Sequence, residues 1–222
     1  MENYRCVTSV QEIQEYIGNA AVVAFDYETA PDEPYRMEEK AALDPYKSHI
    51  VGCSFSTKEH TGIYVPVAHK VGENIENALF LCFLKSFLTN KNIIKIAHNI
   101  AFESAVSCHQ GIVIQPPVYD TICAAQMTLK SNYEFRKLAD SGLKKLASEL
   151  CHEPLPTFSE VTNGRHFDEL DAQDSETVRY GCADSDFALR LYHIFNNWFD
   201  RFLPKHRYIA EQIESPTAVY LG

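Results

Sequence analysis

Acidic residues at two remote points of the chain have the spacing of a metal-binding site. Asp26 and Glu28 lie two residues apart, directly after the apolar run Ala21–Phe25. A strand in this position directs both carboxylates to the same face. Two carboxylates about 4 Å apart repel each other by roughly 4 kcal/mol at the effective dielectric of a protein surface, so a divalent cation or a proton must compensate them. We interpret this pair as half of a metal site, and Asp184 as a candidate for the other half.

A second pair lies near the other end of the chain. A helix over residues 175–202 brings Tyr180 and Asp184, which are four residues apart, to one face where both can project into a site. A tyrosine and an aspartate at this spacing are more often an ordinary surface pair. The strand pair is the stronger signal, because acidic groups that end a buried strand need compensation.

The hydrophobic periodicity predicts an α/β domain whose elements position these residues. The expected strands are 21–25, 50–57, 61–67 and 93–97, and the expected helices are 11–17, 74–88, 99–110, 121–129 and 175–202. The strands 50–57 and 61–67 form a hairpin that lies antiparallel beside the first strand, so the sheet is mixed.

Two stretches lack long regular elements. Residues 29–48 contain three prolines and many charges and predict a loop, and a long loop beside a carboxylate pair is more often functional than idle. Residues 131–164 alternate short amphipathic pieces with prolines and form the most basic part of the chain. We interpret Lys137, Lys144 and Lys145 there as solvated surface charges, with contact to a nucleic-acid backbone as the alternative.

Composition limits the function. The chain has 222 residues, 45% of them apolar, which suits one large domain with a single core. The net charge of −10 disfavours a protein that grips nucleic acid over its whole surface, so such affinity would be local, metal-mediated or supplied by a partner. Seven dispersed cysteines without a Cys-x-x-Cys pair predict reduced thiols of the cytoplasm, and His69 and His98 lack the companion ligands of a zinc site. No apolar run has the length of a signal segment or a membrane span.

A third segment completes a family pattern. Residues 98–103, where a strand ends and a helix begins, have the motif His-Asn-x-x-Phe-acid. The chain also has the motifs Asp-x-Glu-Thr at 26–29 and Tyr-x-x-x-Asp at 180–184. With these motifs the chain resembles the DEDD exonuclease superfamily in its tyrosine subgroup, and most closely the proofreading domain of family A DNA polymerases. The resemblance spans nearly the whole chain.

The resemblance implies a ribonuclease H-like fold, with a mixed sheet of about five strands, the first three antiparallel, flanked by helices. It implies a 3′-5′ exonuclease that removes nucleotides from DNA 3′ ends by two-metal phosphodiester hydrolysis with Mg²⁺ or Mn²⁺. Asp26, Glu28 and Asp184 would hold the first ion, Asp26 with Glu103 would serve the second, and Tyr180 would orient the attacking water. Glu103 stands where the family has aspartate, which keeps the charge and adds one methylene.

The resemblance also implies substrate contacts and partners. Asn99 and Phe102 match residues near the terminal nucleotides, Thr29 offers a backbone contact, and Phe158 matches an aromatic that packs against a base. Core packing is the alternative for both phenylalanines. The expected partners are the single-stranded 3′ end of DNA and a polymerase domain in the same polypeptide of a bacterial or phage-infected cell, and no oligomer is implied. Residues 1–205 would form the exonuclease domain and 206–222 the start of the connection to the polymerase.

Two other interpretations remain open at this stage. A stand-alone exoribonuclease of the ribonuclease D type shares the motifs and the fold. A catalytically silent scaffold or nucleic-acid-binding module has Glu103 as its only support in the sequence.

Overall fold

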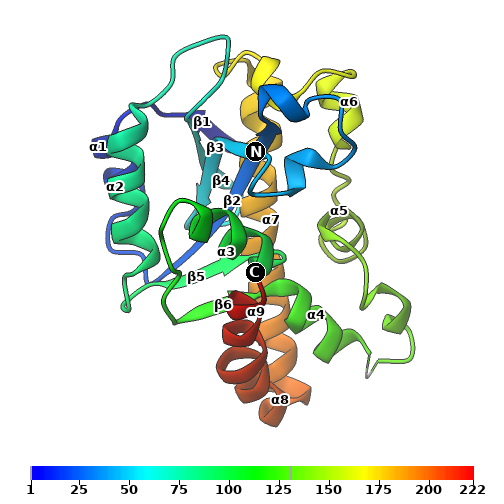
Figure 1. Ribbon diagram of the computed structural model, residues 1–222. Coiled ribbons are helices and arrows are strands. Elements are labelled where there is room, and N and C mark those ends of the chain that lie inside the picture. Colours follow the sequence, from blue (N-terminus) through cyan, green and yellow to red (C-terminus); the bar gives the residue numbers. More distant parts are fainter. Residues whose placement is uncertain (1, 131) are drawn as a thin grey trace.

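One mixed sheet organises the molecule. The computed structural model describes residues 2–130 and 132–222 (Figure 1). Within them six strands pair in the order β1-β4-β3-β2-β5-β6. The antiparallel pairs are β2 with β3 and β3 with β4, and the parallel pairs are β1 with β4, β2 with β5 and β5 with β6. The strands are β1 (Asn3–Cys6), β2 (Val22–Pro31), β3 (Ser48–Ser56), β4 (Thr61–Pro66), β5 (Ile94–Ala97) and β6 (Val118–Asp120).

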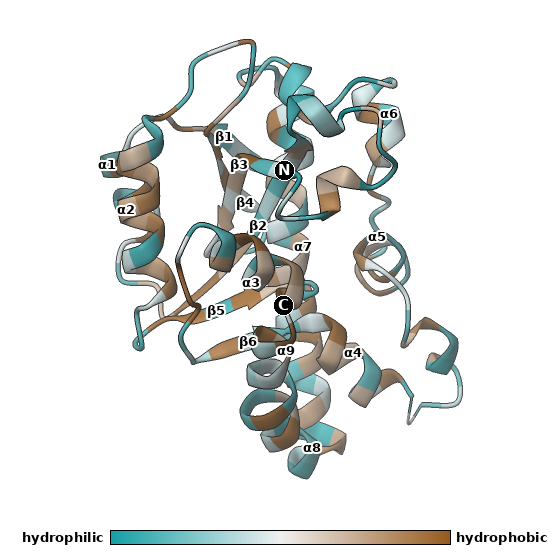
Figure 2. Ribbon diagram, viewed as in Figure 1, coloured by the Kyte–Doolittle hydropathy of each residue, from teal (hydrophilic) through white to brown (hydrophobic). Residues whose placement is uncertain are grey.

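Helices cover both faces of the sheet, and the described residues form two large hydrophobic cores and a smaller cluster around Tyr64 and Phe167. The first core lies between the sheet and α1 (Val10–Ile17), α2 (Asn77–Leu88) and α3 (Ile100–His109). The second lies between the sheet and α4 (Thr121–Leu129), α5 (Leu143–Leu146) and α7 (Ser175–Phe202). Figure 1 shows α1 and α2 side by side on one side of the sheet and α7 on the other, and Figure 2 shows the apolar residues concentrated on the strands and on the inner helix faces.

The principal elements agree with the sequence prediction. Ser9 caps α1, with its hydroxyl accepting from the Glu12 amide, and Gly18 ends that helix at a φ of 50°. Asp120 caps α4 through the Ile122 amide. The helix α7 has the bounds that the periodicity predicts, and Asp174 caps it. The mixed sheet and the antiparallel arrangement of the first three predicted strands are therefore confirmed.

Three local predictions were wrong. The first predicted strand does not end at Phe25, because β2 continues to Pro31 and pairs with β3 over this length. Residues 29–48 are not a plain loop, since after the strand they form the 3₁₀ turns η1 (Glu33–Tyr35) and η2 (Ala41–Leu43). The periodicity predicted only four strands and missed β1 and β6, which bring the sheet to six strands, close to the about five that the resemblance implies.

Short elements complete the chain. The remaining elements are η3 (Arg136–Leu138), η4 (Ala147–Cys151), α6 (Phe158–Thr162), η5 (Phe167–Glu169), α8 (Pro204–Ile209), η6 (Ala210–Glu214) and α9 (Ser215–Leu221). Of these, η4 and η6 are π-helical turns. No helix within residues 2–130 and 132–222 combines the length and the apolar character that crossing a membrane requires.

The C-terminal helices pack back onto the sheet and α3. Ser215 accepts a hydrogen bond from the Asp120 amide at 2.9 Å, and Ser104 of α3 donates to the Val219 carbonyl at 2.6 Å. Residue 222 consequently lies beside α3, where the C label stands in Figure 1.

Candidate active site

Three carboxylates converge on the α7 side of the sheet. Side chains alternate along β2, so Phe25 enters the core under α1 and α2 while Ala24 enters the core under α7. Asp26 and Glu28 follow Ala24 at intervals of two and meet Asp184 of α7. One carboxylate oxygen from each of the three residues lies within 4.8 Å of the others. This spacing allows one cation to contact all three groups.

Burial makes the cluster electrostatically strained. The pKa values of Asp26 and Glu28 are raised well above the ordinary range, first by burial and then by the neighbouring acidic groups. Burial raises the pKa of Asp184 to about 6. Glu28 Oε1 is buried and has no hydrogen-bond partner among residues 2–130 and 132–222. An all-oxygen donor set with an unpaired buried oxygen fits a hard divalent cation such as Mg²⁺ or Mn²⁺.

Glu103 lies next to this cluster but outside its 4.8 Å limit. It projects from the first turn of α3 and is only 1% exposed. Its Oε2 atom has no hydrogen-bond partner in the described part of the chain. The pKa of Glu103 is raised well above its ordinary range by burial, then by the charge of Asp26. Glu103 is therefore a second buried carboxylate that lacks compensation, on the α3 side of Asp26.

Tyr180 is held by a lysine. The Lys144 ammonium donates to the Tyr180 hydroxyl at 2.9 Å and to the Pro156 carbonyl at 2.6 Å, and it lies 4.2 Å from the centre of the Tyr180 ring. Its charge opposes the upward pKa shifts of the three clustered carboxylates. The interpretation of Lys144 as a solvated surface charge was therefore wrong, because the fold carries it into the site. Lys137 is exposed, and Lys145 is exposed and pairs with Glu149.

Tyr180 remains a neutral phenol. Burial, followed by the charges of Glu28, Asp184 and Asp26, raises its pKa above the ordinary value. The hydroxyl oxygen already accepts a hydrogen bond from Lys144. Its proton is therefore available for donation to another oxygen.

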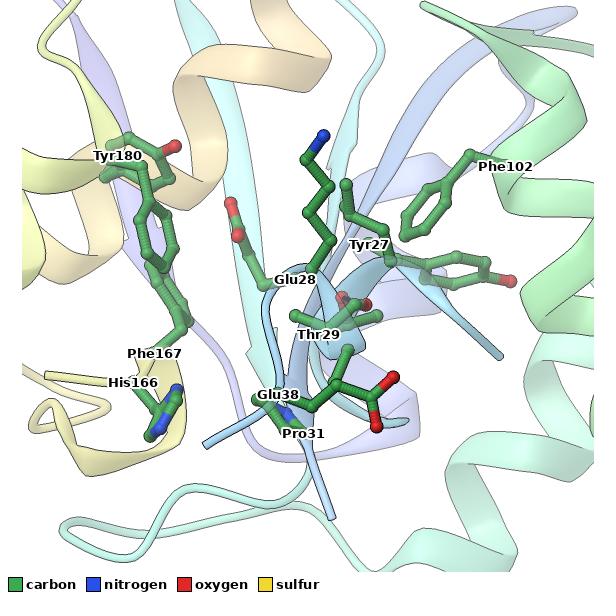
Figure 3. Close-up of a pocket in the computed structure, with 14 residues that line it drawn as sticks. Tyr27, Glu28, Thr29, Pro31, Glu38, Phe102, His166, Phe167 and Tyr180 are labelled. Carbon is green, nitrogen blue, oxygen red and sulfur yellow. Dashed lines mark hydrogen bonds between the residues drawn. The ribbon is translucent and has the colours of Figure 1, made fainter. Parts of the chain in front are cut away.

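An aromatic pocket of about 470 Å³ opens beside the carboxylates. Figure 3 shows Tyr180 and Phe167 on one side of it, Phe102 and Tyr27 on the other, and the Glu28 carboxylate between them. Phe158, at 44% exposure, also lines the pocket, and its ring stacks on Phe167 with centroids 6.3 Å apart. The predicted residues Phe102 and Phe158 are thus brought to one cavity with Glu28 and Tyr180.

Thr29 and Asn99 occupy different positions. Thr29 lines the pocket, and its hydroxyl donates to the Ala42 carbonyl at 2.7 Å, which ties β2 to η2. Asn99 does not line the pocket; it is exposed before α3 and has a φ of 75°, a left-handed conformation that asparagine tolerates. The Asp120 carboxylate accepts from the amides of Asn99 and Ile100, both at 3.1 Å, and so fixes the start of α3.

Several residues of the pocket were not predicted from the sequence. They come from the segment between β2 and β3 and from η5, and they are Glu38, Lys40, Ala41, Ala42, Leu43, His166 and Phe167. The pocket residues between β2 and β3 could have been found from the sequence, since the length of segment 29–48 beside the carboxylate pair indicated a functional loop. His166 and Phe167 had no such signal, because nothing in their local sequence connects them to residues 26–28.

Comparison with known proteins gives the following relatives. A family profile described as 3′-5′ exonuclease matches residues 1–200. DNA polymerase I of Borreliella burgdorferi is 26% identical over 197 residues, which are 86% of this chain and 19% of that protein. DNA polymerase I of Pseudomonas aeruginosa is 24% identical over 209 residues, 91% of this chain and 21% of that protein. The chain thus spans about a fifth of the length of these curated relatives.

Solved structures share the fold at low identity. Brucella melitensis NrnC is similar with a TM-score of 0.65 and 20% identity, covering 100% of this chain and 93% of that one. Trypanosoma brucei RNase D in its GMP complex is similar with a TM-score of 0.72 and 16% identity, covering 98% of this chain and 63% of that one. At these identities the likeness concerns the fold alone.

Proposed function

The chain belongs to the 3′-5′ exonuclease family, and we propose that it removes nucleotides from the 3′ end of single-stranded DNA by metal-dependent hydrolysis. The observation that carries this proposal is the convergence of Asp26, Glu28 and Asp184 within 4.8 Å beside an aromatic pocket. The pocket supplies flat apolar surfaces for a terminal base, and the carboxylates supply oxygen ligands for the cation that acts on the adjoining phosphodiester.

Each residue of the site has a proposed role. Asp26, Glu28 and Asp184 hold a first divalent cation, and Glu103 supports a second from the other side of Asp26. When bound, such cations neutralise charge at the scissile phosphate and lower the pKa of an attacking water. Tyr180, as a neutral phenol whose oxygen accepts from Lys144, donates a hydrogen bond to the oxygen of that water and orients it, keeping its own proton.

The pocket walls hold the substrate. Phe102 and Phe158 stack against bases, an interaction worth about 1 to 3 kcal/mol per base that tolerates every base. Thr29, whose side chain is fixed by Ala42, presents its backbone to the terminal nucleotide. Asn99 approaches the next nucleotide from the start of α3.

We further propose that residues 1–205 act as the proofreading module of a DNA polymerase, with residues 206–222 leading toward the polymerase domain. The similarity to two DNA polymerases I supports this context. A stand-alone ribonuclease D-like exoribonuclease is the second candidate. It is supported by the similarity in fold to Trypanosoma brucei RNase D.

The test is degradation of a 5′-labelled single strand in the presence of Mg²⁺ or Mn²⁺. We expect stepwise shortening from the 3′ end, and a loss of about a thousandfold or more in Asp26→Ala, because the carboxylate shared by both cation positions is removed. Glu59→Ala, in the exposed turn between β3 and β4, is the matched control and should retain full activity.

Three outcomes separate the candidates. Faster degradation of DNA than of RNA of the same sequence supports the proofreading module. Equal or faster degradation of RNA favours the exoribonuclease. If neither the parent nor Glu103→Asp shortens any strand with either metal, the silent scaffold replaces both.

A further inference from the structure

An aromatic groove of about 520 Å³ lies at the far end of α7, away from the carboxylates. Two of its aromatic side chains are largely exposed, Tyr133 at 85% and Phe202 at 72%. Trp198 is partly buried between them and the interior, with its ring 5.7 Å from that of Phe135. We call this the distal groove; it is lined by Thr128, Asn132, Tyr133, Trp198, Phe202 and Leu203.

The distal groove continues the face of α7 that enters the active site. Trp198 follows Tyr180 by 18 residues, and Phe202 follows Asp184 by the same interval. Eighteen residues are five turns of an α-helix and advance about 27 Å. The two aromatic residues therefore lie on the same side of α7 as the two site residues, displaced along the helix axis.

One cation, Arg136, lies at the groove, and other unpaired cations stand close to the lining residues in the sequence. The Arg136 guanidinium lies 5.0 Å from the centre of the Tyr133 ring. No carboxylate within residues 2–130 and 132–222 forms an ion pair with Arg136, Lys137, Arg201 or Lys205. Nearby, Lys130 pairs with Asp140, Arg207 pairs with both Asp200 and Glu211, and Glu134 forms no ion pair among the described residues. In a chain of net charge −10, this is a local excess of cations.

We propose that the distal groove binds the single strand upstream of the 3′ end that occupies the active site. This inference rests on the proposed exonuclease function and adds a second contact to it. Bases stack on Tyr133 and Phe202, and the phosphates contact Arg136, Lys137, Arg201 and Lys205. Aromatic surfaces beside a positively charged path are the features by which proteins hold single strands without reading sequence.

The distance between the two sites sets a length requirement. A strand with a stacked rise of about 3.4 Å per nucleotide spans about 27 Å with about eight nucleotides, and an extended strand needs fewer. In the sequence, the basic residues Arg136 and Lys137 stand between Tyr133 of the groove and Lys144 at the active site. Trinucleotides therefore reach only the active site, and decanucleotides reach both.

A second copy of this chain is a poorer occupant, because two molecules with a charge of −10 repel each other. DNA and RNA share the phosphates and bases that the groove recognises. Separate DNA and RNA arms of the experiment distinguish these sources.

The experiment uses the fluorescence of Trp198, the single tryptophan of the chain. The Asp26→Ala protein, which we expect to bind oligonucleotides without cutting them, is titrated with a trinucleotide and a decanucleotide of thymidine and of uridine. We expect the decanucleotide to bind about tenfold or more tightly than the trinucleotide and to change the Trp198 emission, because stacking in the groove adds to the contacts in the pocket. The trinucleotide, whose binding is measured by isothermal titration calorimetry, should bind without changing the emission.

Variants locate the contact. Adding Tyr133→Ala or Phe202→Ala should weaken decanucleotide binding about fivefold or more and leave trinucleotide binding unchanged. Tyr220→Ala, which removes an exposed aromatic side chain outside the groove, is the matched control and should change neither.

Other results overturn the inference. If Asp26→Ala binds both lengths with equal affinity while the parent cleaves DNA, the distal contact is removed and the proposed function stays intact. If the parent does not cleave and Asp26→Ala does not bind the trinucleotide, the proposed function is contradicted, and the distal contact with it. A change in oligomeric state on Tyr133→Ala, with decanucleotide affinity unchanged, assigns the groove to a protein interface.

Discussion

At the scale of single residues, the contact between Lys144 and Tyr180 determines what the tyrosine can do. A phenol oxygen that accepts from an ammonium group has its proton directed away from that donor. Burial and the nearby carboxylates keep the phenol protonated, so the residue acts as a donor of fixed direction. Lys144 contacts Tyr180 and Pro156, and we propose that it acts on the reaction by positioning Tyr180.

Replacing Lys144 should therefore lower the cleavage rate through Tyr180. We expect Lys144→Met to reduce the single-turnover rate about 10- to 100-fold, and Lys144→Arg to restore part of it, because a positioned donor is lost and then partly replaced. In a Tyr180→Phe protein the same Lys144→Met change should have little further effect, since the hydroxyl it positions is absent. Lys145→Met, at the exposed neighbouring residue, is the control. Losses that multiply in the double variant would assign Lys144 a role independent of Tyr180.

At the scale of elements, the segment between β2 and β3 forms one wall of the pocket and depends on a remote anchor. Arg36 donates to Asp168 Oδ1 at 3.2 Å and also pairs with Asp168 Oδ2. Asp168 lies in η5 and is 1% exposed, and the Lys70 ammonium lies 3.4 Å from the same carboxylate. Although burial opposes it, the hydrogen bond from Arg36 keeps the pKa of Asp168 below its ordinary value.

Removing this anchor should destabilise the domain and loosen the pocket. Loss of one partner of a buried ion pair lowers the free energy of unfolding by about 3 to 5 kcal/mol. We expect a value of about 3 kcal/mol here, because Lys70 still contacts Asp168 after Arg36 is removed. We expect Arg36→Met to lower Tm by about 6 to 12 °C and to raise KM for a short oligonucleotide with kcat little changed. Lys47→Met, which breaks a partly exposed pair with Glu38 in the same segment, should lower Tm by about 2 °C or less. Equal effects of the two substitutions would contradict the role of Arg36 as the anchor.

The same elements indicate how far the sequence alone can be interpreted. The long periodic helices and their caps were predictable, because Asp120 and Asp174 are polar residues directly before regular apolar patterns. The strands β1 and β6 have four and three residues, too few to show a period of two. They become strands by pairing with β4 and β5, which is a tertiary effect.

Only part of the active site could be predicted from the sequence. The motif residues Asp26, Glu28 and Asp184 could be predicted, because they are charged residues next to buried elements. Lys144 and Phe167 do not, because their partners in the fold lie remote in sequence and no local pattern encodes the contact. Chain topology, not residue type, brings them to the pocket.

At the scale of the whole molecule, folding has to bury several carboxylates in an acidic chain. The pKa values of Asp26, Glu28 and Asp184 are raised in the folded state, chiefly by burial. His98 has the opposite effect on the pH dependence of stability, because burial lowers its pKa to about 4. As the pH falls, His98 is therefore protonated in the unfolded chain before it is protonated in the folded protein. The total pH dependence of stability mixes these effects, so the contribution of the carboxylates is the difference between the parent and a variant that lacks their charge.

This difference should depend on pH and on divalent metal together. A raised carboxyl pKa means that the folded state holds the carboxyl proton more tightly than the unfolded chain does. The protonated carboxyl groups therefore contribute stability at low pH. This contribution is lost as the pH rises through about 6, the pKa of Asp184. In EDTA at about pH 8, Asp26→Asn/Asp184→Asn should therefore melt about 3 °C or more above the parent, with the gap narrowing toward about pH 5.5. Millimolar Mg²⁺ should raise Tm of the parent at the higher pH and leave the variant unchanged, because a cation that binds only the folded carboxylates stabilises that state. A parent whose Tm matches that of the variant in EDTA at both pH values, and does not respond to Mg²⁺, would mean that the three carboxylates are neither strained nor able to bind a cation.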